Sequence, residues 1–250
     1  NSKVIELFLE NSIVQKITSI NIETNNKEMF SGAYFFSTMP VKYLIKNIFP
    51  SPTPKLINIA DKLEYRDFIT VGLLVKKLKL KNSKDNSPIT DNWIYIQEKS
   101  VKLGRLQLFN NWSPDLVKNK NYTWLGLEYF CNEGDTLWEM NEKEFGQFAI
   151  NELTSINIID KSDVLDFTVI KMPKTYPAYF GSYSQFEIIQ NYTDSIKNLF
   201  LIGRNGMHKY NNQDHSMLTA MQAVDNIVNN VISKDNIWEI NTENEYLEEK

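Results

Sequence analysis

The stretch Asn198-Leu-Phe-Leu-Ile-Gly-Arg-Asn-Gly-Met-His-Lys-Tyr-Asn-Asn-Gln-Asp-His-Ser216 decides the fold of this chain. Its first five residues are an apolar run, and a helix-patterned run, Met217 to Val228, follows it. This order predicts a strand, a polar loop and a helix start. In open α/β sheets such loops often carry function, and the first amides of the helix would favour a phosphate or a polarised carbonyl oxygen. Capping of the helix by Asn212 or Asp214 explains the same pattern and is compatible with binding.

The composition is that of a folded protein with little net charge. The chain has 250 residues, is 42% hydrophobic and carries a formal net charge of -4, which gives no indication of a nucleic-acid partner. Its one cysteine, Cys131, excludes an internal disulfide and favours a reducing compartment, so we expect a cytoplasmic protein. Because no apolar run reaches 18 residues, we expect no transmembrane segment.

The first residue is Asn1 rather than methionine, and the chain opens directly into a strand-like pattern. We therefore expect a C-terminal part of a longer protein, with an N-terminal part absent. Strands near Phe36 and Leu201 would then lack neighbours, and their exposed edges would allow self-association.

Hydrophobic periodicity predicts a mixed architecture of the α+β or α/β class. Residues 4–8 and 13–22 predict a hairpin, and residues 27–36 a further strand, whose segment Gly32 to Phe36 is apolar enough for burial on both faces. Predicted helices and later strands follow. The helices are expected at 41–48, 55–63, 137–156, 183–192 and from 213 onward, and the strands at 68–80, 93–97, 103–110, 124–131, 164–171 and 198–202.

These elements predict two domains. Residues 1–64 and 195–235 would form one domain, and residues 65–194 an antiparallel-sheet domain with helices. Residues 236–250 are predicted to be an acidic, frayed tail, Trp238 excepted.

The middle sheet presents aromatic and charged side chains together. Strand alternation places Trp93 and Tyr95 on one face. If Tyr95 pairs with Arg105 across the hairpin, that face combines a phenol, a guanidinium and, with Trp112, an indole. A guanidinium can bind a phosphate bidentately, although an arginine packed on aromatic rings gives the same pattern.

Several familiar sites are excluded. His208 and His215 lie in one loop without an acidic or thiol cluster, so we predict no metal site. The nine glycines contain no Gly-x-Gly-x-x-Gly fingerprint for a dinucleotide. Tyr176 and Tyr179 flank Pro177, a setting in which tyrosines are often structural.

The motifs resemble those of amine-oxidase-type flavoproteins and, more specifically, UDP-galactopyranose mutases of the eukaryotic type. Residues 36–40 are similar to the strand end before the substrate domain of that superfamily. Trp93-Ile94-Tyr95, Arg105 ten residues later and Asn111-Trp112-Ser113-Pro114 match a mutase pattern in which tyrosine stands where this chain has Trp112.

The strongest resemblance lies at residues 198–227. The closing FAD-binding segment of the family is matched by Gly203-Arg204-Asn205-Gly206, by Tyr210 and by Asn212-Gln213-Asp214-His215-Ser216. The gap between Tyr210 and Asn212 is two residues shorter than in the family. The family's N-terminal nucleotide-binding half has no counterpart here. The resemblance therefore implies that residues 1–64 and 195–235 are part of a Rossmann-like FAD-binding domain and that residues 65–194 are a substrate domain.

The resemblance also implies roles for individual residues. Reduced flavin N5 is the nucleophile at the anomeric carbon in the mutases, while the protein supplies position and electrostatics. The implied catalytic residues are Arg105, Arg204, Tyr210 and Asn212; the implied substrate-binding residues are Tyr95, Trp112, Tyr176 and Tyr179; the implied FAD-binding residues are Gly203, Arg204, Gln213, Asp214, His215, Ser216 and Met217.

Three hypotheses of function remain. The first is the C-terminal part of an FAD-dependent, mutase-like enzyme acting on a nucleotide sugar in surface polysaccharide synthesis. The second is an FAD-dependent oxidoreductase of the amine oxidase or protoporphyrinogen oxidase type, and the third is a non-catalytic relic that binds a partner. Turnover of a UDP-sugar only after reduction of the protein would favour the first hypothesis. Consumption of oxygen or reduction of an electron acceptor, without an isomerised sugar, would favour the second. A full-length protein that purifies colourless and takes up no flavin would favour the third. Without the glycine fingerprint, the 250-residue chain alone is expected to bind FAD weakly or not at all.

Overall fold

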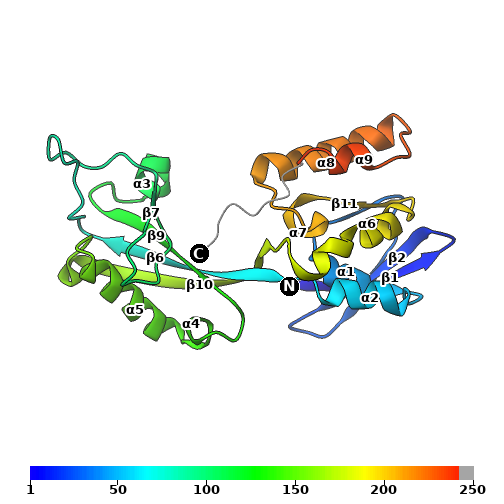
Figure 1. The fold of residues 1–250 in the computed structure, drawn as a ribbon, viewed down its shortest axis with the longest axis horizontal. Coiled ribbons are helices and arrows are strands. Elements are labelled where there is room, and N and C mark those ends of the chain that lie inside the picture. The colour runs from blue at the N-terminus through cyan, green and yellow to red at the C-terminus, as the bar shows by residue number, and fades with distance from the viewer. Residues whose placement is uncertain (242–250) are drawn as a thin grey trace. The chain divides into compact units, whose positions relative to one another are not determined.

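The computed structural model describes residues 1–241 and divides into two compact units (Figure 1). Of the described residues, the first unit contains 1–65 and 176–241, and the second contains 66–175. Helices, an antiparallel sheet and a sheet with parallel pairing occur together, which confirms the predicted mixed fold class.

The first unit begins with the predicted hairpin. Its four-stranded sheet has the order β3-β2-β1-β5. The strands are β1 (Ser2–Glu10), β2 (Ile13–Asn21), β3 (Lys27–Phe30) and β5 (Ile48–Phe49). Asn11 and Ser12 connect β1 to β2 with φ values of 52° and 59°, the left-handed pair that a tight hairpin turn requires.

The strand predicted at 27–36 is two strands in the structure. β3 ends at Phe30, and β4 (Phe35–Ser37) pairs in parallel with β11 (Leu199–Leu201). The expected burial on both faces is wrong, because Tyr34 and Phe36 are 48% and 43% exposed. Among the described residues β4 and β11 have only each other as strand neighbours, and all three residues of β11 are buried.

Helices complete the core of the first unit. They are α1 (Val41–Lys46), α2 (Pro54–Asp61), the 3-10 turn η3 (Gly181–Gln185), α6 (Phe186–Asp194), α7 (Gly203–Met207), α8 (Gln213–Val228) and α9 (Asp235–Trp238). Residues 176–194, which the sequence assigned to the second domain, lie in the first unit because α6 buries Phe186 and Ile189 in the same core as Leu56 of α2.

The second unit is a five-stranded sheet, order β10-β6-β9-β8-β7, whose core contains the apolar face of α5. Its elements are β6 (Tyr65–Val75), β7 (Trp93–Tyr95), β8 (Arg105–Leu108), α3 (Phe109–Trp112), η1 (Pro114–Leu116), β9 (Thr123–Cys131), α4 (Thr136–Glu139), α5 (Glu142–Ser155), η2 (Lys161–Asp163) and β10 (Val164–Pro177). The predicted capping box at the start of α5 is confirmed: the Glu144 amide donates to Asn141 Oδ1 at 3.0 Å, and the Asn141 amide donates to Glu144 Oε2 at 3.2 Å.

The C-terminal segment is ordered further than the sequence indicated. Residues 235–238 form α9, and Ile237 and Trp238 are buried in the first unit. The indole Nε1 of Trp238 donates to Asp194 Oδ2 at 3.0 Å. The remainder of the predicted tail, residues 242–250, lies outside the described residues. Within the described part of the chain, every helix is too short or too polar to cross a membrane.

Candidate functional site

The predicted strand and helix start are present in the first unit, whereas the first part of the predicted loop is a short helix. β11 leads into the short helix α7, and α8 begins at Gln213. Gly203 has a φ of +73° and donates its amide to Thr219 Oγ1 at 3.1 Å, which ties the loop to α8. At Gly206 a Cβ would lie 2.2 Å from the carbonyl oxygen of Ser37, so the close approach to β4 requires glycine.

Arg204 is fixed over two aromatic rings. Its Nε donates to the carbonyl oxygen of Asn211 at 2.9 Å, and its Nη2 lies 3.5 Å from Asn212 Oδ1. Its Cζ is 5.2 Å from the ring centroid of Tyr176 and 4.7 Å from that of Tyr210, within cation–π range. The structure thus brings together four residues that the sequence predicted separately, Tyr176, Arg204, Tyr210 and Asn212.

The two tyrosine rings form the base of this arrangement. Tyr176 is buried and stacks on Tyr210, with centroids 5.6 Å apart and planes inclined by 17°. The amide of Tyr210 donates to the hydroxyl oxygen of Tyr179, whose ring stacks on Tyr183 at 4.8 Å. Tyr179 therefore holds the loop in place.

The start of α8 faces the same loop. The amide of Ser216 makes the first intrahelical bond, to the Asn212 carbonyl oxygen at 3.0 Å, and the Asn212 amide donates to His215 Nδ1 at 3.4 Å. The Asn212 side chain in turn accepts from the His215 amide, which completes a capping box, while the amides of Gln213 and Asp214 belong to the first turn, where an α-helix has no internal partners for its N–H groups. Asp214 points outward, with its side chain 71% exposed.

A cavity of about 480 Å³ lies at this helix start. Its lining residues are Arg204, Asn211, Asn212, Gln213, Ser216 and Met217. Asn211 is the one lining residue that the sequence did not single out, because an asparagine in a polar loop has no pattern around it that would indicate a binding role. The lining offers a guanidinium, side-chain amides and the positive end of the α8 dipole, a donor set that suits carbonyl oxygens and delocalised negative charge.

His208, in the same loop, is a packing residue. It is fully buried, its ring packs against both Tyr183 and Phe186, and its Nε2 lies 3.0 Å from the carbonyl oxygen of Ala178. Burial lowers the pKa of His208 to about 4, so the imidazole is neutral at pH 7. If Nε2 carries the proton, it donates to Ala178, and Nδ1 lacks a hydrogen-bond partner among the described residues.

The C-terminal segment supports the loop in a way that the sequence did not predict. Lys209 Nζ donates to the carbonyl oxygens of Trp238 and Asn241 at 2.6 and 2.5 Å. Asn241 Nδ2 donates to the Tyr210 carbonyl oxygen at 3.2 Å and to Asn211 Oδ1 at 2.9 Å. These contacts join residues about 30 positions apart, so no local pattern reveals them.

The remaining predicted residues, Tyr95, Arg105 and Trp112, lie in the second unit. Tyr95 pairs with Arg105 across the β7–β8 hairpin, so the condition set in the sequence analysis is met. Arg105 Cζ lies 4.8 Å from the ring centroids of both Trp93 and Phe130. The guanidinium is therefore flanked by aromatic rings.

Glu128 on β9 is the carboxylate that faces this guanidinium. Arg105 Nε donates to Glu128 Oε2 at 2.5 Å, and both side chains are almost fully buried, at 3% and 5% exposure. Gln107 Nε2 donates to Glu128 Oε1. Sequence reasoning missed Glu128 because β9 is otherwise apolar, and a single glutamate in such a strand belongs to no recognisable motif.

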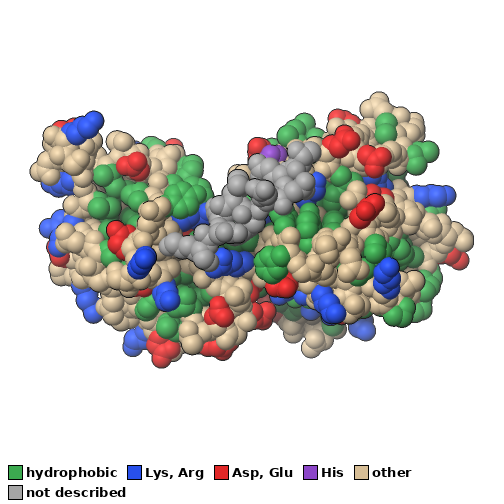
Figure 2. Space-filling model, in the orientation of Figure 1, with side chains coloured by type: hydrophobic (Ala, Val, Ile, Leu, Met, Phe, Trp, Pro, Cys, Tyr) green, Lys and Arg blue, Asp and Glu red, His purple; other side chains and the backbone are tan. Residues whose placement is uncertain are grey.

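Beside this buried pair is an exposed aromatic surface. Trp93 and Tyr95 stack with centroids 6.3 Å apart and planes inclined by 5°, and Trp93 contacts Trp112 at 6.2 Å. The three side chains are 40%, 62% and 47% exposed. Figure 2 shows hydrophobic side chains gathered beside α3 on this unit. Flat, exposed rings of this kind can stack on a planar base or on the apolar face of a sugar.

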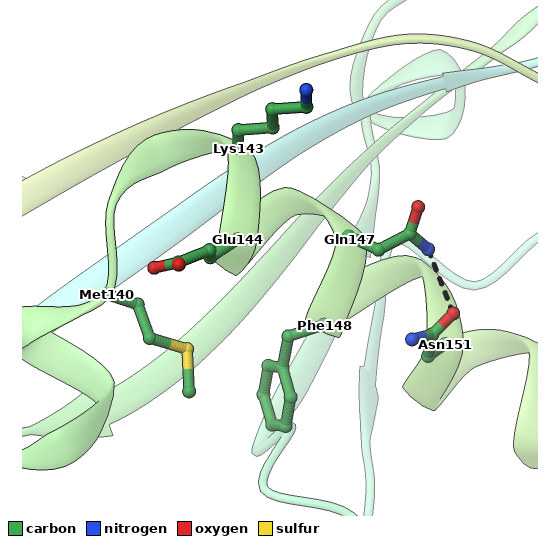
Figure 3. A pocket seen from close by; sticks show the side chains of 6 residues that line it. All are labelled: Met140, Lys143, Glu144, Gln147, Phe148 and Asn151. Atoms are coloured by element: carbon green, nitrogen blue, oxygen red, sulfur yellow. Dashed lines mark hydrogen bonds between the residues drawn. The ribbon is translucent and has the colours of Figure 1, made fainter.

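A second hollow, of about 600 Å³, lies on α5 and contains none of the predicted residues (Figure 3). Phe148 and Met140 form its apolar part, and Gln147 Nε2 donates to Asn151 Oδ1 at 2.9 Å on its rim. Its side chains bring no nucleophile, thiol or paired carboxylates together, so it adds no chemistry to the candidate site.

Comparison with known proteins supports the fold. No protein-family model matches the sequence. The chain shares its fold with a solved UDP-galactopyranose mutase and with a putative protoporphyrinogen oxidase, the kinds of protein that the motifs resemble. A crystal structure of reduced UDP-galactopyranose mutase matches 95% of this chain with a TM-score of 0.75 and 22% identity, and the match covers 48% of that chain. A putative protoporphyrinogen oxidase from Exiguobacterium sp. 255-15 matches 89% of this chain and 46% of its own, with a TM-score of 0.58 and 11% identity.

The chain thus spans about half the length of the solved structures that it matches. Among curated proteins, a DNA ligase of Mycoplasma capricolum subsp. capricolum is 25% identical over 162 residues, which are 60% of this chain and 24% of the ligase. A low-identity match to a quarter of that enzyme assigns no nucleic-acid role to this chain.

Proposed function

We propose that this chain is the C-terminal portion of a flavin-dependent enzyme that acts on a nucleotide sugar, as a mutase-type isomerase in polysaccharide synthesis. The observation that carries the proposal is the cavity at the start of α8, where Arg204 lies over stacked Tyr176 and Tyr210. The reducing, cytoplasmic setting expected from the single Cys131 belongs to the same proposal.

The donor set of this cavity fits the edge of a flavin ring. Gln213 and Asn212 supply amides, Arg204 supplies a cation, and the α8 dipole favours negative charge, which develops on the ring when the flavin is reduced. When bound, the reduced flavin would supply the nucleophilic nitrogen for the sugar's anomeric carbon. Arg204 would balance the negative charge, while Tyr210 and Asn212 hold its guanidinium in one orientation.

In the second unit, the exposed Trp93, Tyr95 and Trp112 would bind the base or sugar by stacking. Arg105 would orient a diphosphate. The hydrogen bond from Arg105 to Glu128 sets the direction of the guanidinium and reduces the net charge that Arg105 can offer to a ligand. We therefore expect Tyr95 and Trp112 to contribute more to substrate affinity than Arg105 does.

The test uses the product of the complete gene. UDP-galactopyranose should be converted to its ring isomer only after dithionite reduction, and Arg204→Lys should lower kcat/KM at least 100-fold because lysine keeps the charge but loses the planar contacts. Lys143→Ala, on the α5 hollow, is the control and should leave kcat/KM unchanged. Turnover that persists in Arg204→Lys would contradict the role of the cavity.

A second candidate is an oxidoreductase of the protoporphyrinogen oxidase type, which the fold match to the Exiguobacterium protein supports. Oxygen consumption or electron-acceptor reduction, with no isomerised sugar, would favour it. A complete gene product that purifies colourless and takes up no FAD would contradict both candidates and favour a non-catalytic, partner-binding protein.

A further inference from the structure

Asn211 lies at the centre of the loop that carries Arg204. Its carbonyl oxygen accepts from Arg204 Nε at 2.9 Å, and its side-chain Nδ2 donates to the Gly203 carbonyl oxygen at 3.2 Å. Asn211 also lines the cavity at the start of α8, yet it is only 1% exposed, so its side chain depends on the protein for its hydrogen bonds. The direction of the Arg204 guanidinium therefore depends on where Asn211 is held.

The C-terminal segment, residues 235–241, holds Asn211 from the other side. Asn241 Nδ2 uses both of its N–H groups, one on Asn211 Oδ1 at 2.9 Å and one on the Tyr210 carbonyl oxygen at 3.2 Å. Asn241 is itself buried, and its carbonyl oxygen accepts from Lys209 Nζ at 2.5 Å. The loop thus anchors the backbone of Asn241, and the side chain of Asn241 anchors the loop.

These contacts reach both groups that orient Arg204. A guanidinium is planar and carries its donors in a rigid fork, so holding Nε and one ring face fixes the direction of the terminal nitrogens. The Nε acceptor is the carbonyl oxygen of Asn211, and one of the two rings under the guanidinium is that of Tyr210. Asn241 donates to each of these two residues. One buried amide therefore controls two of the restraints on Arg204.

We propose that Asn241 is a positioning residue for Arg204. Through Asn211 and Tyr210 it fixes the direction in which the guanidinium faces the cavity at the start of α8. The proposal rests on the proposed function in one respect, namely that the negative charge that Arg204 faces is that of a reduced flavin. Without the two N–H groups of Asn241, the guanidinium takes several directions and favours the reduced, charged ring less strongly.

A residue that only completes the core would behave differently, and Asn236 provides the matched control. Asn236 lies in the same segment, on α9, which lies beside α8 in Figure 1. Its Nδ2 donates to Asn226 Oδ1 at 2.8 Å, near the end of α8 that is remote from the cavity. Asn236→Ala and Asn241→Ala each remove a partly or fully buried side-chain amide from the C-terminal segment, but only Asn241→Ala acts on the loop.

The first measurement needs no flavin and uses the 250-residue chain with ¹⁵N-labelled arginine. The sequence contains three arginines, and the two in the second unit, Arg66 and Arg105, serve as internal references. We expect Asn241→Ala to speed hydrogen exchange at Arg204 Nε–H about tenfold by NMR, and Asn236→Ala to change it by less than about twofold. An unchanged Arg204 rate in Asn241→Ala, or an equal rise in Asn236→Ala, would overturn the proposal.

Lys209→Met tests the same link if Asn241→Ala fails to fold. It removes the ammonium that holds the Asn241 carbonyl oxygen and leaves the Asn241 side chain in place. The exchange rate at Arg204 Nε–H should again rise. A folded Lys209→Met chain with the unchanged rate would show that the C-terminal segment does not position Arg204.

The second measurement uses the complete gene product with bound FAD. A tenfold weaker preference for the reduced ring corresponds to a reduction potential about 30 mV more negative for a two-electron couple, and we expect this shift in Asn241→Ala and not in Asn236→Ala. An unchanged potential despite faster exchange at Arg204 would overturn the proposal. Faster exchange in a gene product that binds no flavin leaves the positioning role standing and removes the proposed function, whereas unchanged exchange in a flavin-containing protein does the reverse.

Discussion

The buried pair between Arg105 and Glu128 gives the sharpest prediction of stability. Glu128→Gln keeps the shape of the side chain and removes the carboxylate charge that faces the guanidinium. Because the two side chains are only 3% and 5% exposed, solvent cannot replace that charge. Removing one member of a buried ion pair typically costs about 3–5 kcal/mol, and we expect a loss of unfolding free energy in that range.

The measurement is a double-mutant cycle of Glu128→Gln and Arg105→Met, followed by urea unfolding with tryptophan fluorescence. The double variant should lose less than the sum of the singles by about 2 kcal/mol or more, because neither charge is then left facing an uncharged partner. The matched control is Lys79→Met, in the same unit, which removes the Lys79–Asp160 pair. In that pair Lys79 Nζ lies 2.7 Å from Asp160 Oδ1, a distance similar to that in the buried pair, but the two side chains are 36% and 48% exposed. The loss of unfolding free energy should therefore be below about 1 kcal/mol. A Glu128→Gln loss no larger than that of Lys79→Met would refute the reasoning.

The other predictions concern the first unit and the isolated chain. His208 should titrate near pH 4 by NMR; since its folded pKa lies below the unfolded value of about 6.5, stability is complete above pH 6.5 and falls by about 3 kcal/mol as pH drops towards 4, a slope that His208→Asn should lack. Gly206→Ala should destabilise the chain by about 3 kcal/mol in urea, because a Cβ at 2.2 Å from the Ser37 carbonyl oxygen displaces β4; a change below about 1 kcal/mol would show that the backbone relaxes. Asn241→Ala should speed amide exchange at Tyr210 and Asn211, and unchanged rates would remove the supporting role of the C-terminal segment. The 250-residue chain alone should bind FAD more weakly than micromolar in a titration, and it should self-associate through its strand edges in light scattering, whereas a clean monomer would count against the latter.

The local patterns of the sequence determined most of the elements. Apolar alternation at residues 4–22 specified the hairpin, and Asn141 with Glu144 specified the start of α5. Strand alternation placed Trp93 and Tyr95 on one face, but the sequence left open whether Tyr95 pairs with Arg105, because a long connection between two strands does not fix their register. The strand, loop and helix around Gly203 were also set locally, by an apolar run, a polar loop and a capped apolar-periodic segment.

Only the tertiary structure decided which groups face one another. Glu128 meets Arg105 across strands, and Asn241 reaches the Tyr210 loop from the far end of the chain, and such contacts depend on chain reversals that no short window encodes. The outward turn of Met221 and Val224 is decided in the same way. Periodicity places these residues on one side of α8, but the hydrogen bonds of Thr219 and Asn226 determine which side faces the core.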